Sequence, residues 1–380
     1  MIQRLVQRSW AWCGALLLMA LSSAAIHAAV LGADSERGQG LFVSLACIQC
    51  HSVNGHGGAV GPDLGRIVAR GFTPASLAAT MWNHAPSMWP QIRARGLEIG
   101  NLDEQAAADL FAYFYSARFF DKPGDAARGK RVFETKHCEV CHGLTAAKLP
   151  EAKPVSAWES IGHPMALVNA MWNHVGLMNT EFKKQNVTWA ALTSQDVSDL
   201  LVYVRNLPPG RHVTPGLKVA SGPLGEELFH SKGCGNCHQG KLALPPRLAG
   251  RTLTDIAVDM WNHGPRMAGK APQLTLDEMR DVVSYLWAGA FFTPTGSVSA
   301  GERVFKAKRC AECHTTGAGG APSLSSVKGS LTAAGMVSAL WRHGPKMLDT
   351  MGAQGISWPT FSAPEMANLI AYLNTTGGAK

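Results

Sequence analysis

Four copies of the pentapeptide pattern Cys-x-x-Cys-His constrain this 380-residue chain more than any other feature. They read CIQCH, CEVCH, CGNCH and CAECH, and they occupy residues 47–51, 138–142, 234–238 and 310–314. Their first cysteines are 91, 96 and 76 residues apart, a period at which each copy fits one small structural unit. Eight of the nine cysteines belong to these patterns, and the ninth is Cys13.

The surroundings of the four copies are also alike, which indicates an internal repeat. Each copy is preceded by a short helical pattern and followed by an octapeptide and a second amphipathic pattern with helical spacing. The octapeptides are MWNHAPSM (81–88), MWNHVGLM (171–178), MWNHGPRM (260–267) and LWRHGPKM (340–347). Glycines in the first helical pattern are expected to let helices cross closely; they are Gly40, Gly129, Gly225 and Gly301.

We therefore predict an all-α fold of four small tandem domains, separated by connectors rich in proline and glycine. Residues 1–29 are predicted to be a secretory signal peptide, because Arg4 and Arg8 precede an apolar run of about a dozen residues. The predicted domains are repeat 1 (30–121), repeat 2 (122–218), repeat 3 (219–294) and repeat 4 (295–380). No later segment is long and apolar enough to suggest a membrane anchor after cleavage.

The Cys-x-x-Cys-His pattern predicts covalent attachment of haem. Two cysteines three residues apart on a helical turn present both sulfurs on one side, where they can add to the two vinyl groups of a haem. The next histidine then lies beneath the iron. A zinc site needs a second ligand pair nearby, and a thioredoxin-type dithiol needs a βαβ context; the sequence favours neither. The predicted attachment residues are Cys47, Cys50, Cys138, Cys141, Cys234, Cys237, Cys310 and Cys313, and the predicted proximal ligands are His51, His142, His238 and His314.

The octapeptide supplies candidates for the second axial ligand. Its tryptophan, histidine and methionine are the same in all four copies, whereas its first and third positions vary. In three copies a proline follows the histidine by two residues, which predicts that the helix ends there and that the methionine lies in a loop over the haem. We favour Met88, Met178, Met267 and Met347, and the alternative ligands are His84, His174, His263 and His343. The tryptophans are expected to pack against the porphyrin.

With these features the chain resembles four fused class I c-type cytochrome domains over residues 31–380. GPDLG (61–65), PPRLAG (245–250) and APSLS (321–325) are similar to the family's turn in which a proline carbonyl binds the proximal histidine. The resemblance gives this role to Pro62, Pro246 and Pro322, whereas KPVSAW (153–158) of repeat 2 departs from the pattern, with Pro154 in the matching place. It implies compact helical domains, electron transfer and methionine-ligated iron.

The expected function is that of a periplasmic or secreted carrier with four covalently bound haem c groups, which passes electrons between redox proteins. The alternatives are a haem enzyme that reduces a small molecule at one open haem, with repeat 2 as its candidate, and the cytochrome subunit of a dehydrogenase complex. Without Arg4 and Arg8, 33 basic and 27 acidic residues leave a charge of +6, which eight propionates offset. Nucleic acid is therefore not an expected partner. Lys136, Lys232 and Lys308, each two residues before a cysteine, are candidates for docking acidic partners.

Overall fold

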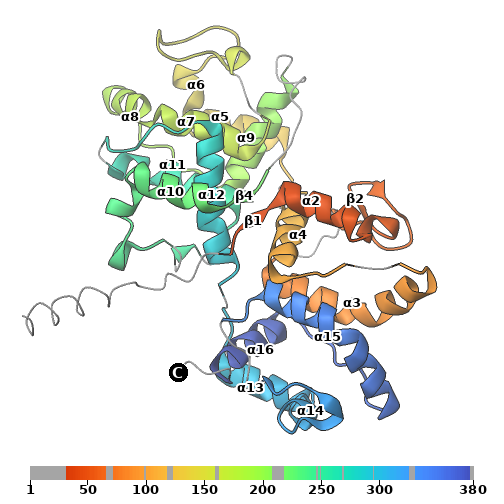
Figure 1. Cartoon of the computed structure of the whole chain (residues 1–380). Coiled ribbons are helices and arrows are strands. Elements are labelled where there is room, and N and C mark those ends of the chain that lie inside the picture. Colours follow the sequence, from red (N-terminus) through yellow and green to blue (C-terminus); the bar gives the residue numbers. More distant parts are fainter. Residues whose placement is uncertain are drawn as a thin grey trace, which may run out of the picture. The chain divides into compact units, whose positions relative to one another are not determined.

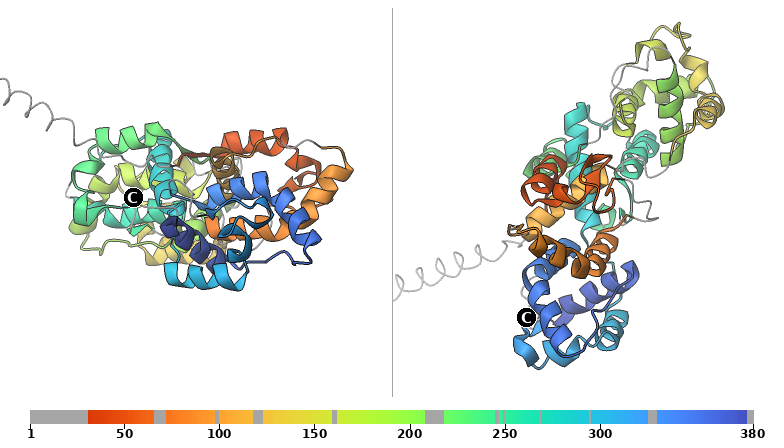
Figure 2. Two further views of the ribbon diagram at one scale, coloured as in Figure 1. Left: turned by 60° about the horizontal axis from the view of Figure 1, so that its bottom comes forward. Right: turned by 90° about the vertical axis from the view of Figure 1, so that its right-hand side faces the viewer.

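The computed structural model describes residues 31–65, 72–97, 100–117, 123–158, 162–207, 218–244, 247–248, 250–267, 269–293, 295–324 and 330–376. Helices make up nearly all of its regular structure (Figures 1 and 2), so the predicted all-α fold is confirmed. In this part of the chain no helix is both long and apolar enough to cross a bilayer. The predicted signal peptide lies outside the described residues, and the predicted domain boundaries stay predictions.

Each predicted repeat contains a short series of helices. Repeat 1 has β1 (Ala33–Asp34), α2 (Ser35–Ser44), η1 (Cys47–Gln49), β2 (Ser52–Val53), β3 (His56–Gly57), α3 (Pro74–Ala94) and α4 (Glu104–Ser116). Repeat 2 has α5 (Ala126–Thr135), α6 (Cys138–Cys141), η2 (Val155–Ala157), α7 (Pro164–Asn173), α8 (Val175–Lys184) and α9 (Ser194–Asn206). Repeat 3 has β4 (Ala220–Ser221), α10 (Pro223–Ser231), η4 (Cys234–Asn236), η5 (Gly240–Leu242), α11 (Leu253–His263), η7 (Gly264–Met267) and α12 (Leu276–Phe291). Repeat 4 has α13 (Val298–Ala307), α14 (Ala311–His314), η8 (Ala318–Gly320), α15 (Ala333–Ala353) and α16 (Ala363–Thr376).

The first and last helices of every repeat pack against each other: α2 on α4, α5 on α9, α10 on α12 and α13 on α16. A glycine on the first helix makes this crossing possible, because a Cβ there would overlap a backbone carbonyl of the last helix; the four pairs are Gly38 with Asp109, Gly129 with Asp199, Gly225 with Asp281 and Gly301 with Asn368. The prediction of Gly40 was wrong, because Gly40 faces open space. Gly38 lies four residues before the buried Phe42, which is the spacing that the other repeats share.

In repeats 1 and 2 a buried carboxylate on the last helix also stabilises the contact between the first and last helices. Asp199 of α9 is 2 % exposed and accepts hydrogen bonds from the backbone N–H of Asp125 at 2.7 Å and from Nε and Nη2 of Arg128 at 2.8 Å each. Asp109 and Arg37 form the same two-pronged ion pair in repeat 1. Burial raises the pKa of Asp199, but the hydrogen bonds from Arg128, Asp125 and Gln195 outweigh it and lower that pKa overall.

The tryptophan of the octapeptide binds another repeat in three of the four cases. Its indole Nε1–H donates to a carbonyl in the segment just before the last helix of that repeat. The distance is 2.8 Å each time, from Trp82 to Pro359, from Trp172 to Pro272 and from Trp261 to Ala190. Repeat 1 thus docks on repeat 4, and repeats 2 and 3 dock on each other. We expected these indoles to pack on the porphyrin, and the structure gives their N–H groups a partner in protein backbone instead.

The asparagine that follows each of these tryptophans completes the docking. Each asparagine binds the backbone of the residue two positions after the one that accepts from the tryptophan. Its Nδ2 donates to the carbonyl of that residue, and its Oδ1 accepts from the N–H of the same residue. These hydrogen bonds are 2.7–3.0 Å long and join Asn83 to Phe361, Asn173 to Leu274 and Asn262 to Leu192. In each of these three cases, the asparagine of a neighbouring repeat thus satisfies both the backbone N–H and the backbone C=O of one residue.

The fourth case differs because repeat 4 has Arg342 where the other repeats have asparagine. α15 of repeat 4 still packs against α3 and α4 of repeat 1. Trp341 and Arg342 line an open cavity of about 360 Å³ there, together with Gly100 and Asn101 from the matching segment of repeat 1. Of the four contacts made by the octapeptides, this one therefore contains an open cavity in place of the asparagine hydrogen bonds.

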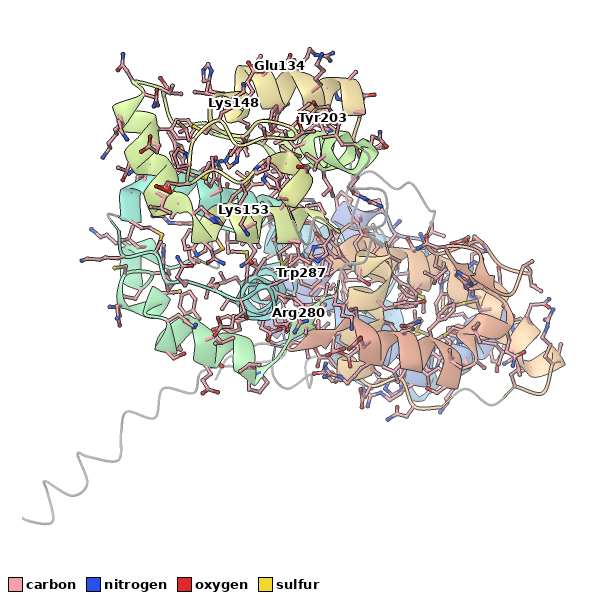
Figure 3. The ribbon with its side chains drawn as sticks, turned by 90° about the horizontal axis from the view of Figure 1, so that it is seen from above. Glu134, Lys148, Lys153, Tyr203, Arg280 and Trp287 are labelled. Carbon is pink, nitrogen blue, oxygen red and sulfur yellow. The ribbon has the colours of Figure 1, made fainter. Side chains whose placement is uncertain are left out.

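Repeats 1 and 3 meet through a separate contact. β1 pairs with β4 in an antiparallel two-stranded sheet, with Ala33 opposite Ser221. The hydroxyl of Tyr115 accepts a hydrogen bond from the backbone N–H of Leu253 at 2.9 Å, and the ring of Tyr115 lies 4.6 Å from the ring of Trp287. Trp287 lies on α12 and is labelled in Figure 3. Contacts thus run from repeat 2 to 3, from 3 to 1 and from 1 to 4, an order that differs from the order in the sequence.

The Asp199–Arg128 pair predicts a pH-dependent contribution to stability. Asp199→Asn keeps the shape but removes the charge, and we expect the free energy of unfolding to fall by about 1–3 kcal/mol at neutral pH. Because the folded-state pKa of Asp199 is lowered, the contribution is present above the ordinary carboxyl pKa and disappears as the pH falls through the folded-state value. Denaturant unfolding of both proteins between neutral and acidic pH measures this, and a difference that does not shrink in acid contradicts it.

The docking asparagines predict a second stability effect. Asn262→Ala leaves the backbone N–H and C=O of the buried Leu192 without their partners and should cost about 1–3 kcal/mol. The matched control is Arg342→Ala, at the same octapeptide position of repeat 4, where we expect a much smaller change. Unfolding midpoints followed by tryptophan fluorescence compare the two variants. Equal losses in both would show that the asparagine hydrogen bonds do not stabilise the docking.

Candidate functional site

Each Cys-x-x-Cys-His pattern forms one tight helical turn. The backbone N–H of the histidine donates to the carbonyl of the first cysteine at 2.9–3.0 Å in all four copies. The residue before the turn has a positive φ: Ala46, His137, Gly233 and Arg309. Positive φ is uncommon for residues other than glycine, so these turns hold the backbone in a demanding conformation. They hold the two cysteines and the histidine of each copy within one turn of backbone, and the haem-binding role of these residues stays a prediction.

The cysteine thiols are unpaired, and burial raises the pKa of several of them. All eight in the described part of the chain are free of disulfide bonds. Burial raises the pKa of Cys138 to about 12 and the pKa of Cys47 and of Cys310 to about 11. A reactive redox dithiol needs a lowered thiol pKa, so burial disfavours that alternative. Among the described residues, moreover, no group of three or more His, Cys, Asp or Glu side chains could hold a metal ion.

The predicted proximal histidines are oriented by backbone carbonyls. Nδ1 of His51 lies 3.0 Å from Pro62 O, and Nδ1 of His314 lies 2.9 Å from Pro322 O, as the resemblance implied. A carbonyl can only accept, so Nδ1 carries the proton and Nε2 keeps its lone pair free for a metal. The loop after His51 passes so close to the ring that a Cβ at Gly61 would overlap it.

The predicted proximal histidines of repeats 2 and 3 differ from this pattern in their hydrogen-bond acceptors. In repeat 2 the acceptor is Lys153 O, 2.9 Å from Nδ1 of His142, so the assignment to Pro154 was off by one residue. In repeat 3, Nδ1 of His238 is buried and has no hydrogen-bond partner among the described residues. Its predicted acceptor, Pro246, lies outside the described residues, so that role stays a prediction.

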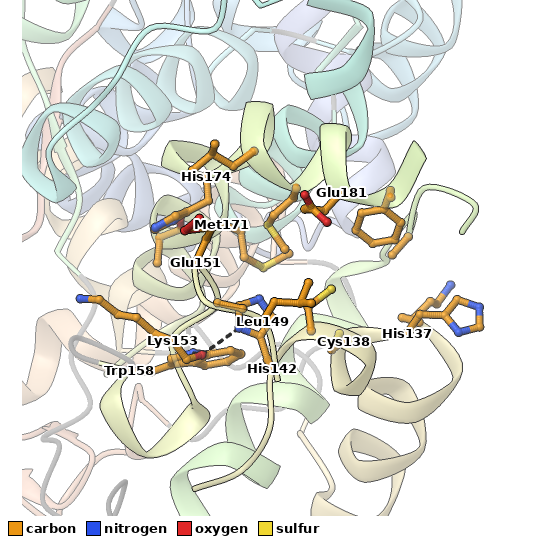
Figure 4. Close-up of a pocket in the computed structure, with 18 of the residues that line it drawn as sticks. His137, Cys138, His142, Leu149, Glu151, Lys153, Trp158, Met171, His174 and Glu181 are labelled. Carbon is orange, nitrogen blue, oxygen red and sulfur yellow. Dashed lines mark hydrogen bonds between the residues drawn. The ribbon is translucent and has the colours of Figure 1, made fainter. Parts of the chain in front are cut away.

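A cavity of about 460 Å³ lies next to the cysteines of repeat 2. Cys138, His142 and Trp158 lie on one side of it, and Met171 and His174 lie on the opposite side (Figure 4). Met178 also lines it, and so does Trp261, which belongs to repeat 3. The size is in the range of small-molecule and cofactor sites, and the lining is mostly apolar. Two thiols, one imidazole with a free Nε2 and an apolar wall fit the requirements of a covalently bound haem.

The helices that carry the octapeptides do not end where we expected. α3 continues through Pro86 and Pro90, and α15 continues through Pro345. A proline inside a helix leaves the carbonyl four residues earlier without its helical partner. For Pro86 this carbonyl is Trp82 O, and it accepts a hydrogen bond of 3.1 Å from Nε1 of Trp358 in repeat 4 instead. The prediction that the helix ends near the histidine was wrong for repeats 1 and 4, and in repeat 1 the other repeat supplies this donor. In repeat 3 the helix α11 ends at His263, as predicted.

The residues of the octapeptide differ in where they lie. The ring of His84 faces that of His51, and the ring of His263 faces that of His238, with 6.0 Å between the centroids in both pairs. Burial, together with the facing histidine, lowers the pKa of His84 and of His263, which favours neutral imidazole. His174 and His343 are exposed. The predicted methionine ligands Met88, Met178, Met267 and Met347 are all half-buried.

The three lysines proposed for docking partners have internal contacts. Each Nζ donates to a carbonyl in the segment before the last helix of its own repeat: Lys136 to Ala191, Lys232 to Gln273 and Lys308 to Thr360. Lys232 and Lys308 also form ion pairs with Glu278 and Glu365. Each acceptor lies between the residues that bind the tryptophan and the asparagine of the neighbouring repeat. These lysines therefore support that docking segment.

Family comparisons agree with this geometry. The model described as cytochrome c matches residues 35–117 and 126–208, and the model described as "Cytochrome C oxidase, cbb3-type, subunit III" matches residues 220–286 and 296–373. Each matched segment contains one Cys-x-x-Cys-His turn. Comparisons with curated proteins and with solved structures gave no match. The turns, the oriented histidines and both family matches lead to one conclusion: the chain is a c-type cytochrome with several cytochrome c domains, which binds haem c covalently and transfers electrons.

Proposed function

We propose that the protein is an exported electron carrier with four haem c groups, one at each Cys-x-x-Cys-His turn. The observation that carries the number four is the recurrence of the same local geometry. In every copy the turn closes with the same hydrogen bond from the histidine N–H to the first cysteine carbonyl, and the thiols are unpaired. In three copies a described carbonyl also fixes the ring of the histidine.

The chain's own residues would hold the cofactor in a simple way. The two thiols of each turn would hold one haem by adding across its two vinyl groups, each forming a carbon–sulfur bond while the thiol hydrogen goes to the other vinyl carbon. The histidine presents Nε2 to the iron, because its Nδ1–H is fixed by a carbonyl. Bound haem supplies an iron centre that accepts and releases one electron. Apolar side chains such as Phe133 and Leu200 around the cavity of repeat 2 keep water away and set the local dielectric.

Contacts between repeats support a carrier over four isolated sites. Trp261 of repeat 3 forms part of the wall of the repeat 2 cavity, so the site of one repeat borders the next. Repeats 3 and 1, and repeats 1 and 4, also contact each other directly. A chain of neighbouring redox sites suits the passage of several electrons between redox proteins. The predicted signal peptide supports a periplasmic or secreted location. Disulfide bonds can form in such a compartment, and bonding of the cysteines to haem would account for their being unpaired.

Coulometric reduction of the oxidised holoprotein tests the proposal. We expect four electrons per chain for the wild type and three for each of four variants in which both cysteines of one turn are replaced by serine, for example Cys234→Ser with Cys237→Ser. The matched control is Cys13→Ser, which lies in the predicted signal peptide and should leave the count at four. A wild-type count below four, or a double variant that still takes four electrons, contradicts the proposal.

A ligand-binding measurement separates the carrier from a haem enzyme. A carrier with two axial ligands at every iron should not bind carbon monoxide when reduced at neutral pH. Repeat 2, with the cavity around His142, is the place where an open iron would be expected. Stoichiometric binding of carbon monoxide to one haem of the native protein would favour the enzyme.

A further inference from the structure

The two facing histidine pairs have a separation that suits a metal between them. A nitrogen–metal bond is about 2 Å long. In a five-membered ring with bonds of about 1.35 Å, each atom lies about 1.1 Å from the centroid. Two imidazoles on opposite sides of one metal therefore have centroids about 6.2 Å apart. The observed separation is 6.0 Å for His51 with His84 and again 6.0 Å for His238 with His263.

Direct hydrogen bonding between the rings does not explain this spacing. At such a separation the nearest ring nitrogens are too far apart for an N–H···N bond. Within the described part of the chain, no hydrogen bond links either pair. In repeat 1, Nδ1 of His51 is already engaged by Pro62 O, so its Nε2 is the atom left for a ligand. In two separate repeats, two half-buried imidazoles with interplanar angles of 68° and 53° thus lie at a centroid separation that would admit a metal ion between them.

The methionine of repeat 1 has another role in the structure. Because α3 is not interrupted, Met88 lies on the same helix one turn beyond His84. Its side chain packs against the apolar cluster of Ala85, Trp89 and Leu340, which joins α3 to α15 of repeat 4. This packing places Met88 at the contact between repeats 1 and 4. In repeat 3, Met267 likewise packs against buried apolar side chains.

Repeats 2 and 4 show the opposite arrangement. His174 is exposed, and its Nδ1 is bound to Ala170 O of its own helix at 2.5 Å. Met178 lines the cavity that also contains Cys138 and His142, and it packs against the apolar cluster around them. In repeat 4, His343 is exposed and Met347 is half-buried.

Given the four haems of the proposed function, we infer that the irons of repeats 1 and 3 have histidine as the second axial ligand, from His84 and His263, whereas those of repeats 2 and 4 have methionine, from Met178 and Met347. Methionine ligation raises the reduction potential of a haem. Each docked pair of repeats, 1 with 4 and 2 with 3, therefore combines one centre of lower potential with one of higher potential.

Conservative methionine variants of the full holoprotein test this assignment. Oxidised haem with a methionine ligand has a weak absorption band near the red end of the visible spectrum, which bis-histidine haem lacks. Met178→Leu and Met347→Leu should each remove half of this band and lower the potential of one haem in a spectroelectrochemical titration. The matched controls Met88→Leu and Met267→Leu should leave the band and all four potentials unchanged. Loss of band intensity in either control overturns the assignment.

Histidine variants give the complementary readout. His84→Ala and His263→Ala should each open one iron, so that the reduced protein binds one equivalent of carbon monoxide, whereas His174→Ala and His343→Ala should bind none. Carbon monoxide binding in the second pair but not in the first overturns the assignment. Haem content of every variant is measured by intact mass. Four haems with a different ligand pattern would refute this inference alone, whereas fewer than four would refute the proposed function.

Discussion

Hydrogen bonds from one repeat to the backbone of another are the interactions on which the arrangement of this molecule depends. The segment before each last helix is extended, and its N–H and C=O groups need partners when it is buried. In repeats 2, 3 and 4 a tryptophan and an asparagine from a neighbouring repeat supply them, and a lysine of the same repeat binds the carbonyl in between. A repeat of this size buries little apolar surface alone. The hydrogen bonds between repeats therefore compensate for the small hydrophobic core of each repeat.

Local chemistry explains which parts of the site the sequence could predict. The eight cysteines and four predicted proximal histidines are related by their spacing within one turn, and the structure closes each of these turns with the same backbone hydrogen bond. The carbonyls that orient His51 and His314 also lie only eleven and eight residues away. In contrast, Lys153 could not be distinguished from Pro154, because a carbonyl acceptor has no side-chain signature and the loop of repeat 2 lacks the usual pattern.

Contacts between distant residues explain what the sequence could not predict. Pro86 indicated a helix end, and only a donor 272 positions later, Trp358, lets the helix continue. The repeated tryptophan was expected to pack against the porphyrin, whereas its N–H group binds another repeat in three of the four copies. The lysines near the cysteines were interpreted as candidates for docking acidic partners, and their hydrogen bonds to backbone carbonyls of the same repeat were not predicted. Arg342 replaces the docking asparagine in repeat 4, and this is the contact that is built differently.

The account depends on haem being bonded to the chain at all four turns, and the intact mass of the natively exported protein tests this most directly. The account predicts the mass of the mature polypeptide plus four haems, unchanged after denaturation in acid and organic solvent. A mass equal to that of the polypeptide alone, or haem that leaves the chain on denaturation, would contradict it.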